Sequence, residues 1–242
     1  MDRPRRTACG MTSGERGAAA LADLVAVMDR LRSPGGCPWD AEQTHATLVP
    51  YAIEEVFELA EAVESGDLEA LREELGDVLL QVVFHARVAA EHPTEPFDIG
   101  DVAAGIAAKL RRRHPHVFAD AQVRDAAHVS RRWDEIKQDE KQRDSVLDGI
   151  PLALPALARA QKVLSRAGRA AEPVAVPQGG DVGARLLALV AEAQTNGVDA
   201  EGALRTAVRE YEQRVRDAEA GPHGRRPESN VPRTSRRDGY LQ

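Results

Sequence analysis

The chain has 242 residues, of which 43% are apolar and 29% are charged, and its formal net charge is −7. This length suffices for one large domain or two small ones, and the apolar share is ordinary for a globular protein. Aromatic residues make up only 4%, so Ala, Leu and Val must supply most of the packing. Together with abundant Glu and Arg they favour helices, and we expect an all-α protein.

The charge is unevenly distributed along the chain. Residues 1–16 carry a net charge of +2 and residues 221–242 carry +3, which leaves −12 for residues 17–220. A body this acidic repels a phosphate backbone, so we do not expect nucleic acid as a partner. Concentrated carboxylates suit divalent cations better.

The two cysteines, Cys9 and Cys37, form neither a disulfide framework nor a zinc-binding pattern. The basic start of the chain is not followed by the apolar run of a signal peptide, and no apolar stretch reaches 18 residues. We therefore expect a cytoplasmic protein without a membrane partner. Met11 is an alternative start of translation.

Helical periodicity runs through the first half of the chain. It predicts four helices, over about residues 18–32, 48–65, 68–91 and 99–113. The Pro- and Gly-rich segment 33–44 interrupts the first pair, and Pro115 ends the fourth helix near Arg113. Asp67 and Asp98 stand where the caps of the third and fourth helices are needed.

In the second half, Pro-containing connectors are expected over residues 145–160 and 170–180. Helices are predicted over about residues 126–142, 181–195 and 199–219. Residues 221–242 contain too little apolar material to fold.

Acidic side chains mark the second and third predicted helices. On the second, Glu54, Glu55 and Glu58 lie opposite an apolar arc, and a solvated acidic face is the common interpretation of such a pattern. The third helix is apolar around nearly its whole circumference and is predicted to be buried. Its carboxylates Glu74 and Asp77 share one narrow polar strip, and buried carboxylates need a cation.

The short link over residues 65–67 predicts that these two helices are antiparallel, so that four carboxylates meet across the seam. The four are Glu55, Glu58, Glu74 and Asp77. Carboxylate ligands without His or Cys favour Mg²⁺ or Mn²⁺ over zinc. A di-iron site would need Glu-x-x-His pairs, which neither Glu58 nor Glu74 begins. Gly76 between the last two acids suggests close helix packing there.

Written as a motif, Glu54-Glu55-Val56-Phe57-Glu58 and, fifteen residues later, Glu74-Leu75-Gly76-Asp77 is E-E-x-x-E followed by E-x-x-D. This resembles the MazG family of nucleoside triphosphate pyrophosphohydrolases, within the all-α NTP pyrophosphatase superfamily. The similarity covers residues 20 to about 160. It continues through residues 31–44, 74–86, 109–120 and 131–141 in the family's order.

The resemblance implies an antiparallel helical bundle that hydrolyses nucleoside triphosphates with Mg²⁺, or Mn²⁺ as a substitute, to a monophosphate and pyrophosphate. The metal ligands it implies are Glu55, Glu58, Glu74 and Asp77. It leaves Glu54 as a catalytic residue that orients or deprotonates the attacking water. Metal ions can neutralise the triphosphate and lower the pKa of bound water, in agreement with this chemistry.

The resemblance also implies substrate-binding residues, namely Lys109, Arg112, Arg113, Trp133 and Lys137. The first three match the phosphate-contacting Lys-x-x-Arg-Arg of the family, and the last two match a pair that meets the nucleoside and the phosphate. Basic residues also suit any helix C-terminus, and a Trp at helical spacing is often a core residue. Trp39 can line the base pocket or anchor its loop.

The second half resembles a shortened repeat of the first. Asp181 and Ala184 stand where E-x-x-D is expected, and no E-E-x-x-E segment precedes them. The expected organisation is a tail (1–17), a MazG-like catalytic domain (18–150), a degenerate MazG-like region (151–220) and a second tail (221–242). Helices with two apolar faces predict a homodimer, and the dimeric state of the family implies the same. One working site per chain is expected.

A house-cleaning role against noncanonical or damaged nucleotides is what the resemblance suggests. Two alternatives stay open. The first is a related all-α hydrolase specific for dUTP or a phosphoribosyl-ATP, which would share the acids and differ in the pocket. The second is a non-catalytic protein that senses nucleotides or binds a partner.

Overall fold

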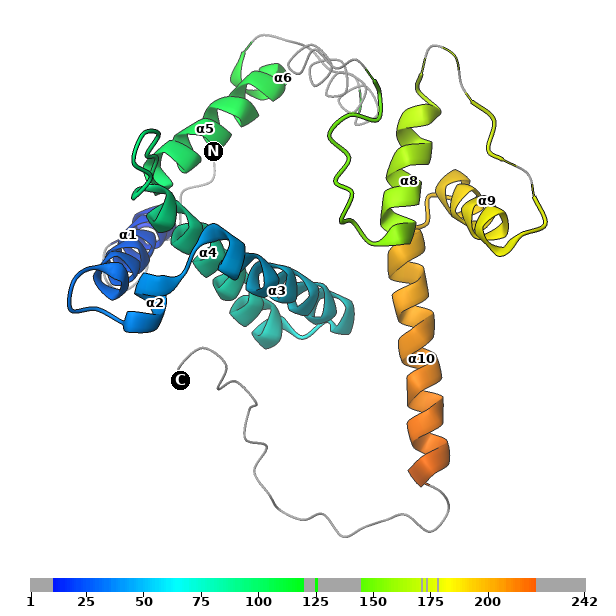
Figure 1. The fold of residues 1–242 in the computed structure, drawn as a ribbon, viewed down its shortest axis with the longest axis horizontal. Helices are drawn as coiled ribbons and strands as arrows, with labels where there is room; N and C mark the ends of the chain where they lie inside the picture. Colours follow the sequence, from blue (N-terminus) through cyan, green and yellow to red (C-terminus); the bar gives the residue numbers. More distant parts are fainter. Residues whose placement is uncertain are drawn as a thin grey trace. The chain divides into compact units, whose positions relative to one another are not determined.

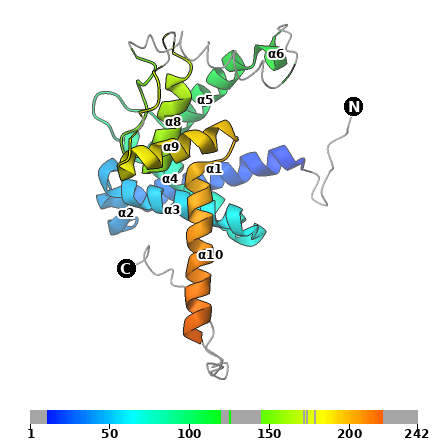
Figure 2. The ribbon, with the colours of Figure 1, turned by 90° about the vertical axis from the view of Figure 1, so that its right-hand side faces the viewer.

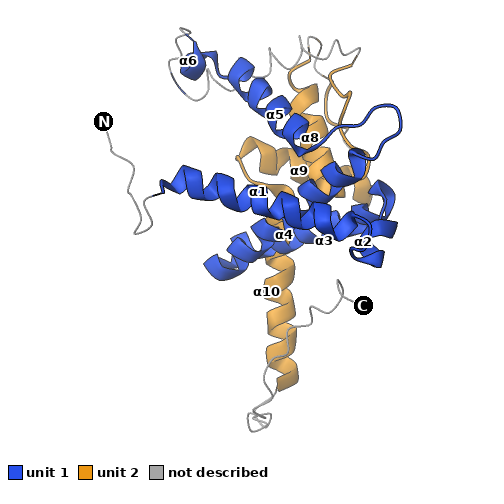
Figure 3. Ribbon diagram, turned by 90° about the vertical axis from the view of Figure 1, so that its left-hand side faces the viewer, with its two compact units in different colours: residues 1–136 blue, residues 137–242 orange. Residues whose placement is uncertain are grey.

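The computed structural model describes residues 11–119, 125, 145–170, 172, 174–177 and 179–220. The regular structure of these residues is helical throughout, which confirms the all-α prediction. Figure 1 shows the helices in chain order. The chain divides into two compact units, residues 1–136 and 137–242, which Figure 3 colours separately.

The described part of the first unit contains six helices, and four of them were predicted. Their bounds are α1 (Ser13–Arg32), α2 (Pro38–Glu42), α3 (His45–Ser65), α4 (Leu68–Ala89), α5 (Ile99–Arg113) and α6 (Pro115–Phe118). The predicted ends at Arg32, Ser65 and Arg113 are confirmed. The short helices α2 and α6 were missed, because each starts on the proline taken as a helix breaker. Proline is well tolerated at the first position of a helix.

Helices α3 and α4 form an antiparallel hairpin with a very short connection. Gly66 ends α3 in the left-handed conformation (φ 73°), which a glycine adopts without steric cost. Asp67 then caps α4, as predicted, because its Oδ1 accepts hydrogen bonds from the backbone N–H groups of Glu69 and Ala70. The two caps fix which residues of the helices face each other.

The hydrophobic core of this unit lies where α1 crosses the hairpin. Its buried residues are Met28, Leu48, Val83 and Phe84. Trp39 from α2 packs edge-on against Phe84 and Tyr51, with ring centroids 6.4 and 6.0 Å apart. These contacts support the interpretation of Trp39 as the anchor of its loop.

The prediction that α4 is buried all round is wrong for the chain by itself. Helix α3 covers one side of α4 and α1 covers another, and the remaining side exposes Leu75, Leu79 and Val82. Gly76 lies on the exposed side, and a Cβ built there would meet nothing within 4 Å. The close packing suggested for Gly76 is therefore not made within the chain.

The second unit is built from α8 (Ala156–Ala167), α9 (Val182–Thr195) and α10 (Ala200–Ala220). The last two agree with the predicted helices. The connector expected over residues 145–160 is shorter than predicted, because Pro155 stands at the N-cap of α8 and so begins that helix instead of preventing it. The helix predicted over residues 126–142 lies outside the described residues. Within the described ranges, none of the helices combines the length and the apolar character needed to cross a bilayer.

Candidate metal centre

Three of the predicted carboxylates converge across the α3–α4 hairpin. Glu55 and Glu58 lie one turn apart on α3, and Glu74 lies opposite them on α4. Each offers one ligand oxygen, and these oxygens all lie within 4.8 Å of one another. The antiparallel hairpin therefore brings together residues that are up to 19 positions apart in the sequence.

Burial and spacing both suit a hard divalent cation. Glu55 is 4% exposed and Glu74 is 5% exposed, whereas Glu58 lies at the surface. Placing two carboxylates in such an environment is costly unless a cation joins them. Opposite ligands of an octahedral Mg²⁺ lie about 4.2 Å apart, since each Mg–O distance is ~2.1 Å. The three carboxylates thus fit such an ion after small side-chain adjustments.

The other acids of the motif flank this group. Asp77 is half-buried one turn beyond Glu74 on α4, and Glu54 is exposed beside Glu55 on α3. The described residues whose ligand atoms cluster within 4.8 Å include neither of them. Gln81 is buried two turns beyond Glu74, so the polar strip of α4 continues past the acids.

The basic residues of the expected phosphate site lie on the last two turns of α5. Lys109 and Arg113 are half-buried and Arg112 is exposed. Helix α5 contacts α4, the helix that carries Glu74. His114 ends α5, and its Nδ1 lies 2.7 Å from the carbonyl oxygen of Leu110, in keeping with a structural role. The predicted substrate-binding residues Trp133 and Lys137 lie outside the described residues.

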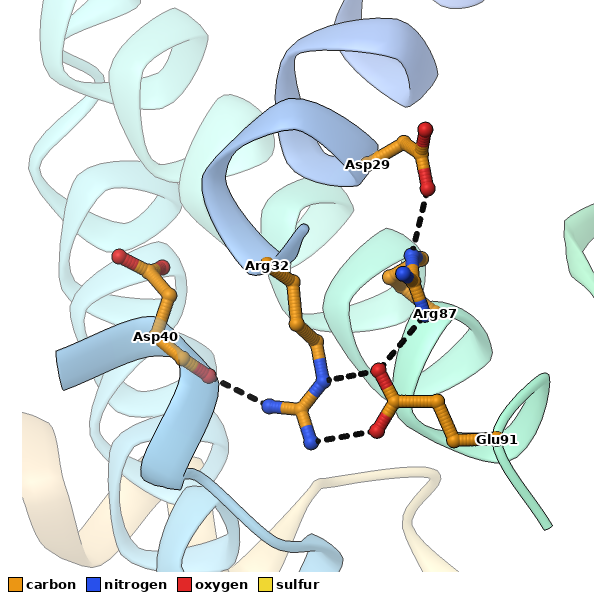
Figure 4. Close-up of polar contacts among 5 residues, drawn as sticks. All are labelled: Asp29, Arg32, Asp40, Arg87 and Glu91. Atoms are coloured by element: carbon orange, nitrogen blue, oxygen red, sulfur yellow. Dashed lines mark hydrogen bonds and ion pairs between the residues drawn. The ribbon is translucent and has the colours of Figure 1, made fainter. Parts of the chain in front are cut away.

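A network of ion pairs ties α1 and α2 to the end of α4 (Figure 4). The guanidinium of Arg32 donates two hydrogen bonds of 2.9 Å to the carboxylate of Glu91 and a third to the backbone carbonyl of Asp40. Arg87 pairs with both Glu91 and Asp29, at 2.7 and 2.8 Å. The hydrogen bond from Arg32 lowers the pKa of Glu91, although partial burial opposes the shift.

One polar pair of the hairpin was missed in the sequence. His45, the first residue of α3, places its Nδ1 2.8 Å from the Nδ1 of His85 on α4. The predicted antiparallel hairpin was sufficient to find this pair. His45 and His85 lie 21 and 19 positions from Gly66, so an antiparallel pair brings them to the same level.

The fold and the site define a helical protein that carries, on an antiparallel hairpin, a cluster of carboxylates able to hold a metal ion. Residues 43–118 match the MazG nucleotide pyrophosphohydrolase domain, and this match spans the whole hairpin. A nucleoside triphosphate pyrophosphohydrolase/pyrophosphatase MazG of Thermotoga maritima is 37% identical over 221 residues, which are 81% of this chain and 84% of that relative. The chain therefore belongs to the MazG nucleotide pyrophosphohydrolase family.

Two other relatives are more similar in sequence. An uncharacterized 26.1 kDa protein of Streptomyces cacaoi is 52% identical over 204 residues, which are 83% of each chain. A nucleoside triphosphate pyrophosphohydrolase of Mycolicibacterium smegmatis is 44% identical over 222 residues. These residues are 90% of this chain but only 64% of that relative, so a third of the longer protein has no counterpart in the alignment.

Proposed function

We propose that this protein is a nucleoside triphosphate pyrophosphohydrolase that uses Mg²⁺, with Mn²⁺ as a substitute. The observation that carries the proposal is the convergence of Glu55, Glu58 and Glu74 within 4.8 Å on the matched domain. The names of the T. maritima and M. smegmatis relatives point to the same reaction. The substrates are ribo- or deoxyribonucleoside triphosphates, and the products are a monophosphate and pyrophosphate.

Each acid has a role in this reaction. Glu55, Glu58 and Glu74, with Asp77 as a fourth ligand, hold the metal. An ion held by these residues would supply charge neutralisation for the triphosphate and polarisation of the α-phosphoryl group. Glu54 orients a water molecule and accepts its proton, the water oxygen attacks the α-phosphorus, and the bond from that phosphorus to the bridging oxygen breaks. Pyrophosphate leaves with the bridging oxygen.

Positive charge beyond the metal is needed to hold a triphosphate. Lys109, Arg112 and Arg113 supply it from α5, since Arg and Lys side chains donate charge-assisted hydrogen bonds to phosphate oxygens. Trp133 and Lys137 complete the substrate site by contacting the nucleoside and a phosphate. In this arrangement α3 and α4 bind the metal, while α5 and the segment after it bind the substrate.

The active protein is proposed to be a homodimer that covers the exposed apolar face of the hairpin. This face consists of Ile53, Val56, Phe57, Val63, Leu75, Leu79 and Val82. An apolar patch this large is typical of an interaction surface. In a protein that also carries Val208→Asp, so that the exposed apolar stripe of α10 cannot hold two copies together, Val56→Glu should give a monomer by light scattering, whereas Leu152→Glu, at an exposed leucine of the second unit, should not change the mass. A dimeric Val56→Glu/Val208→Asp protein would refute the assignment of this face.

In the cell, the protein is proposed to act in the reducing cytoplasm, where Cys37 stays a free thiol. One working site per chain removes noncanonical or damaged nucleotides from the nucleotide pool. The degenerate region over residues 151–220, with Asp181 and Ala184 in place of metal ligands, takes no part in the chemistry.

The test is product analysis with purified protein. Each common NTP and dNTP is incubated with Mg²⁺ and, separately, with EDTA, and the products are separated by anion-exchange chromatography. Monophosphate and pyrophosphate that disappear with EDTA are expected. Turnover restricted to dUTP or a phosphoribosyl-ATP would favour the related hydrolases, and nucleotide binding without turnover would favour a sensing protein. Diphosphate and phosphate as products would overturn the proposed bond cleavage.

A further inference from the structure

Helix α10 carries an apolar stripe that the described residues leave uncovered. The stripe consists of Leu204, Val208, Tyr211 and Val215, which are 52%, 45%, 65% and 39% exposed. Their spacing of four, three and four residues keeps them on one side of the helix. The stripe is therefore a continuous surface of two heptads.

In the described part of the second unit, the side-chain hydrogen bonds that tie α10 to α8 lie at the N-terminal end of α10. The side chain of Gln161 on α8 accepts a hydrogen bond from the backbone N–H of Ala200 and donates one to the carbonyl of Val198. The carboxylate of Glu201 accepts a hydrogen bond from the backbone N–H of Ala158. In both Figure 1 and Figure 2 the rest of α10 extends beyond α8 and α9. From Glu201 to Val215 the helix runs about 21 Å.

Three of the four stripe residues, Leu204, Val208 and Val215, are of types that suit a parallel two-stranded coiled coil. With Val208 and Val215 at the a positions of the heptad, Leu204 and Tyr211 occupy the d positions. β-branched residues at a and leucine at d favour two parallel strands over larger bundles. This assignment uses every large apolar residue of α10.

The flanking charges agree with the same arrangement. In a parallel pair, a g residue faces the e residue of the next heptad on the other strand. Arg214 at g would face the Glu219 of a second copy, and the reverse contact would form by symmetry. The preceding g position is Ala207, so Glu212 at e meets no like charge.

We propose that the α10 helices of two copies pair in parallel along residues 204–219. A second copy is the occupant that fits, because an identical helix supplies both the matching a and d residues and the opposite charges. The pairing also compensates for the small core of the second unit, in which the buried apolar residues of the described part are Ile150 and Val190. This contact is distinct from the α3–α4 face and does not depend on nucleotide hydrolysis.

The test is disulfide formation at a d position. Leu204→Cys is introduced into the full chain with Cys9 and Cys37 replaced by serine, and the protein is exposed to oxidised glutathione. In a parallel pair the two introduced thiols lie within disulfide range, because d residues of the strands face each other. We expect most of the protein to migrate as a covalent dimer on a denaturing gel.

A matched control uses the opposite side of the helix. Gln213 occupies an f position and donates a hydrogen bond to Asp217 of its own helix, so Gln213→Cys should form covalent dimers at least tenfold less. Adding Val208→Asp to the Leu204→Cys protein should abolish the covalent dimer. Val208 is exposed, so this change leaves the folding of a single chain intact.

Three outcomes would overturn the proposal. Equal dimer yields from both cysteine variants would mean random collision. A thiol at position 204 that forms no dimer and reacts slowly with maleimide would place the stripe against the rest of its own chain. Preferential linkage of Leu204→Cys in one copy to Val215→Cys in another would make the pair antiparallel.

Discussion

The imidazoles of His45 and His85 are joined through their Nδ1 atoms, which lie 2.8 Å apart. The ring planes differ by only 5° and the centroids lie 5.1 Å apart, about the largest separation that this contact permits. The rings therefore meet edge to edge, and one Nδ1 donates a proton that the other accepts. This hydrogen bond closes the open end of the α3–α4 hairpin, opposite Gly66.

The histidine pair predicts a pH dependence of stability. Burial, and secondly the charge of His45, lower the pKa of His85. Below about pH 6.5 the unfolded chain then binds more protons than the folded one, so the free energy of unfolding falls as the pH drops and levels off below the folded pKa. His85→Gln should flatten this decline in urea unfolding between pH 7.5 and 5.5. At pH 7.5 it should cost about 1 kcal/mol, the value of one hydrogen bond.

The control for that experiment is His92→Gln, at an exposed histidine beyond the end of α4. It should keep the decline of the parent protein. An unchanged pH profile in His85→Gln would show that the pair does not contribute to it.

Removing a carboxylate of the metal centre should abolish turnover without unfolding the protein. Glu55→Gln and Glu74→Gln should each lower kcat at least about 100-fold, because each removes a proposed metal ligand. Glu61→Gln, at an exposed acid on the same helix, should leave kcat unchanged. Asp77→Asn tests the fourth ligand in the same assay.

Thermal unfolding gives a readout of the same site that is independent of activity. Mg²⁺ at 100 times its Kd should stabilise the parent protein by about 2.7 kcal/mol and the Glu55→Gln protein much less. Without Mg²⁺, Glu55→Gln should be at least as stable as the parent, because it relieves repulsion among clustered carboxylates. Equal stabilisation of both proteins by Mg²⁺ would place the metal elsewhere.

Arg32 is predicted to matter for stability rather than for catalysis. Its side chain is 7% exposed and serves both Glu91 and the carbonyl of Asp40, so Arg32→Ala leaves two acceptors short of a donor. We expect a loss of about 3 kcal/mol in urea unfolding. The matched control is Arg72→Ala, because the Arg72 side chain is 82% exposed in its pair with Glu69. This change should alter stability by less than about 0.5 kcal/mol. Similar losses for both variants would contradict this.

Asp181 should prove to be a capping residue. Its Oδ1 accepts a 3.0 Å hydrogen bond from the backbone N–H of Ala184 at the start of α9. Asp181→Ala should cost about 1 kcal/mol of stability and leave kcat and KM unchanged. Asp181→Asn, which keeps a capping oxygen, should recover most of the loss. Reduced turnover in a folded and correctly assembled Asp181→Ala protein would mean that the second half takes part in catalysis.

The sequence predicted the hairpin and its three clustered acids because the signals are local. Gly66 and the Asp67 cap lie within 12 residues of the acids they place, and the helical periodicity is read from the same two segments. The exposure of Leu75, Leu79 and Val82 could not be predicted, because it depends on which neighbours α1 and α3 leave uncovered. The role of Trp39, as part of the base pocket or as the anchor of its loop, could not be predicted either. It depends on the contact with Phe84, which lies forty-five positions away in the sequence.

The short hairpin also bears on how the metal centre forms during folding. All three clustered carboxylates lie within 20 consecutive residues, so bringing them together closes only one short loop. The entropy of loop closure grows with loop length, and contacts between near neighbours in sequence form early in folding. We therefore expect the acids to meet as soon as α3 and α4 dock, before α1 and α2 complete the core. Divalent cations present at that stage should accelerate refolding by relieving the repulsion across the seam.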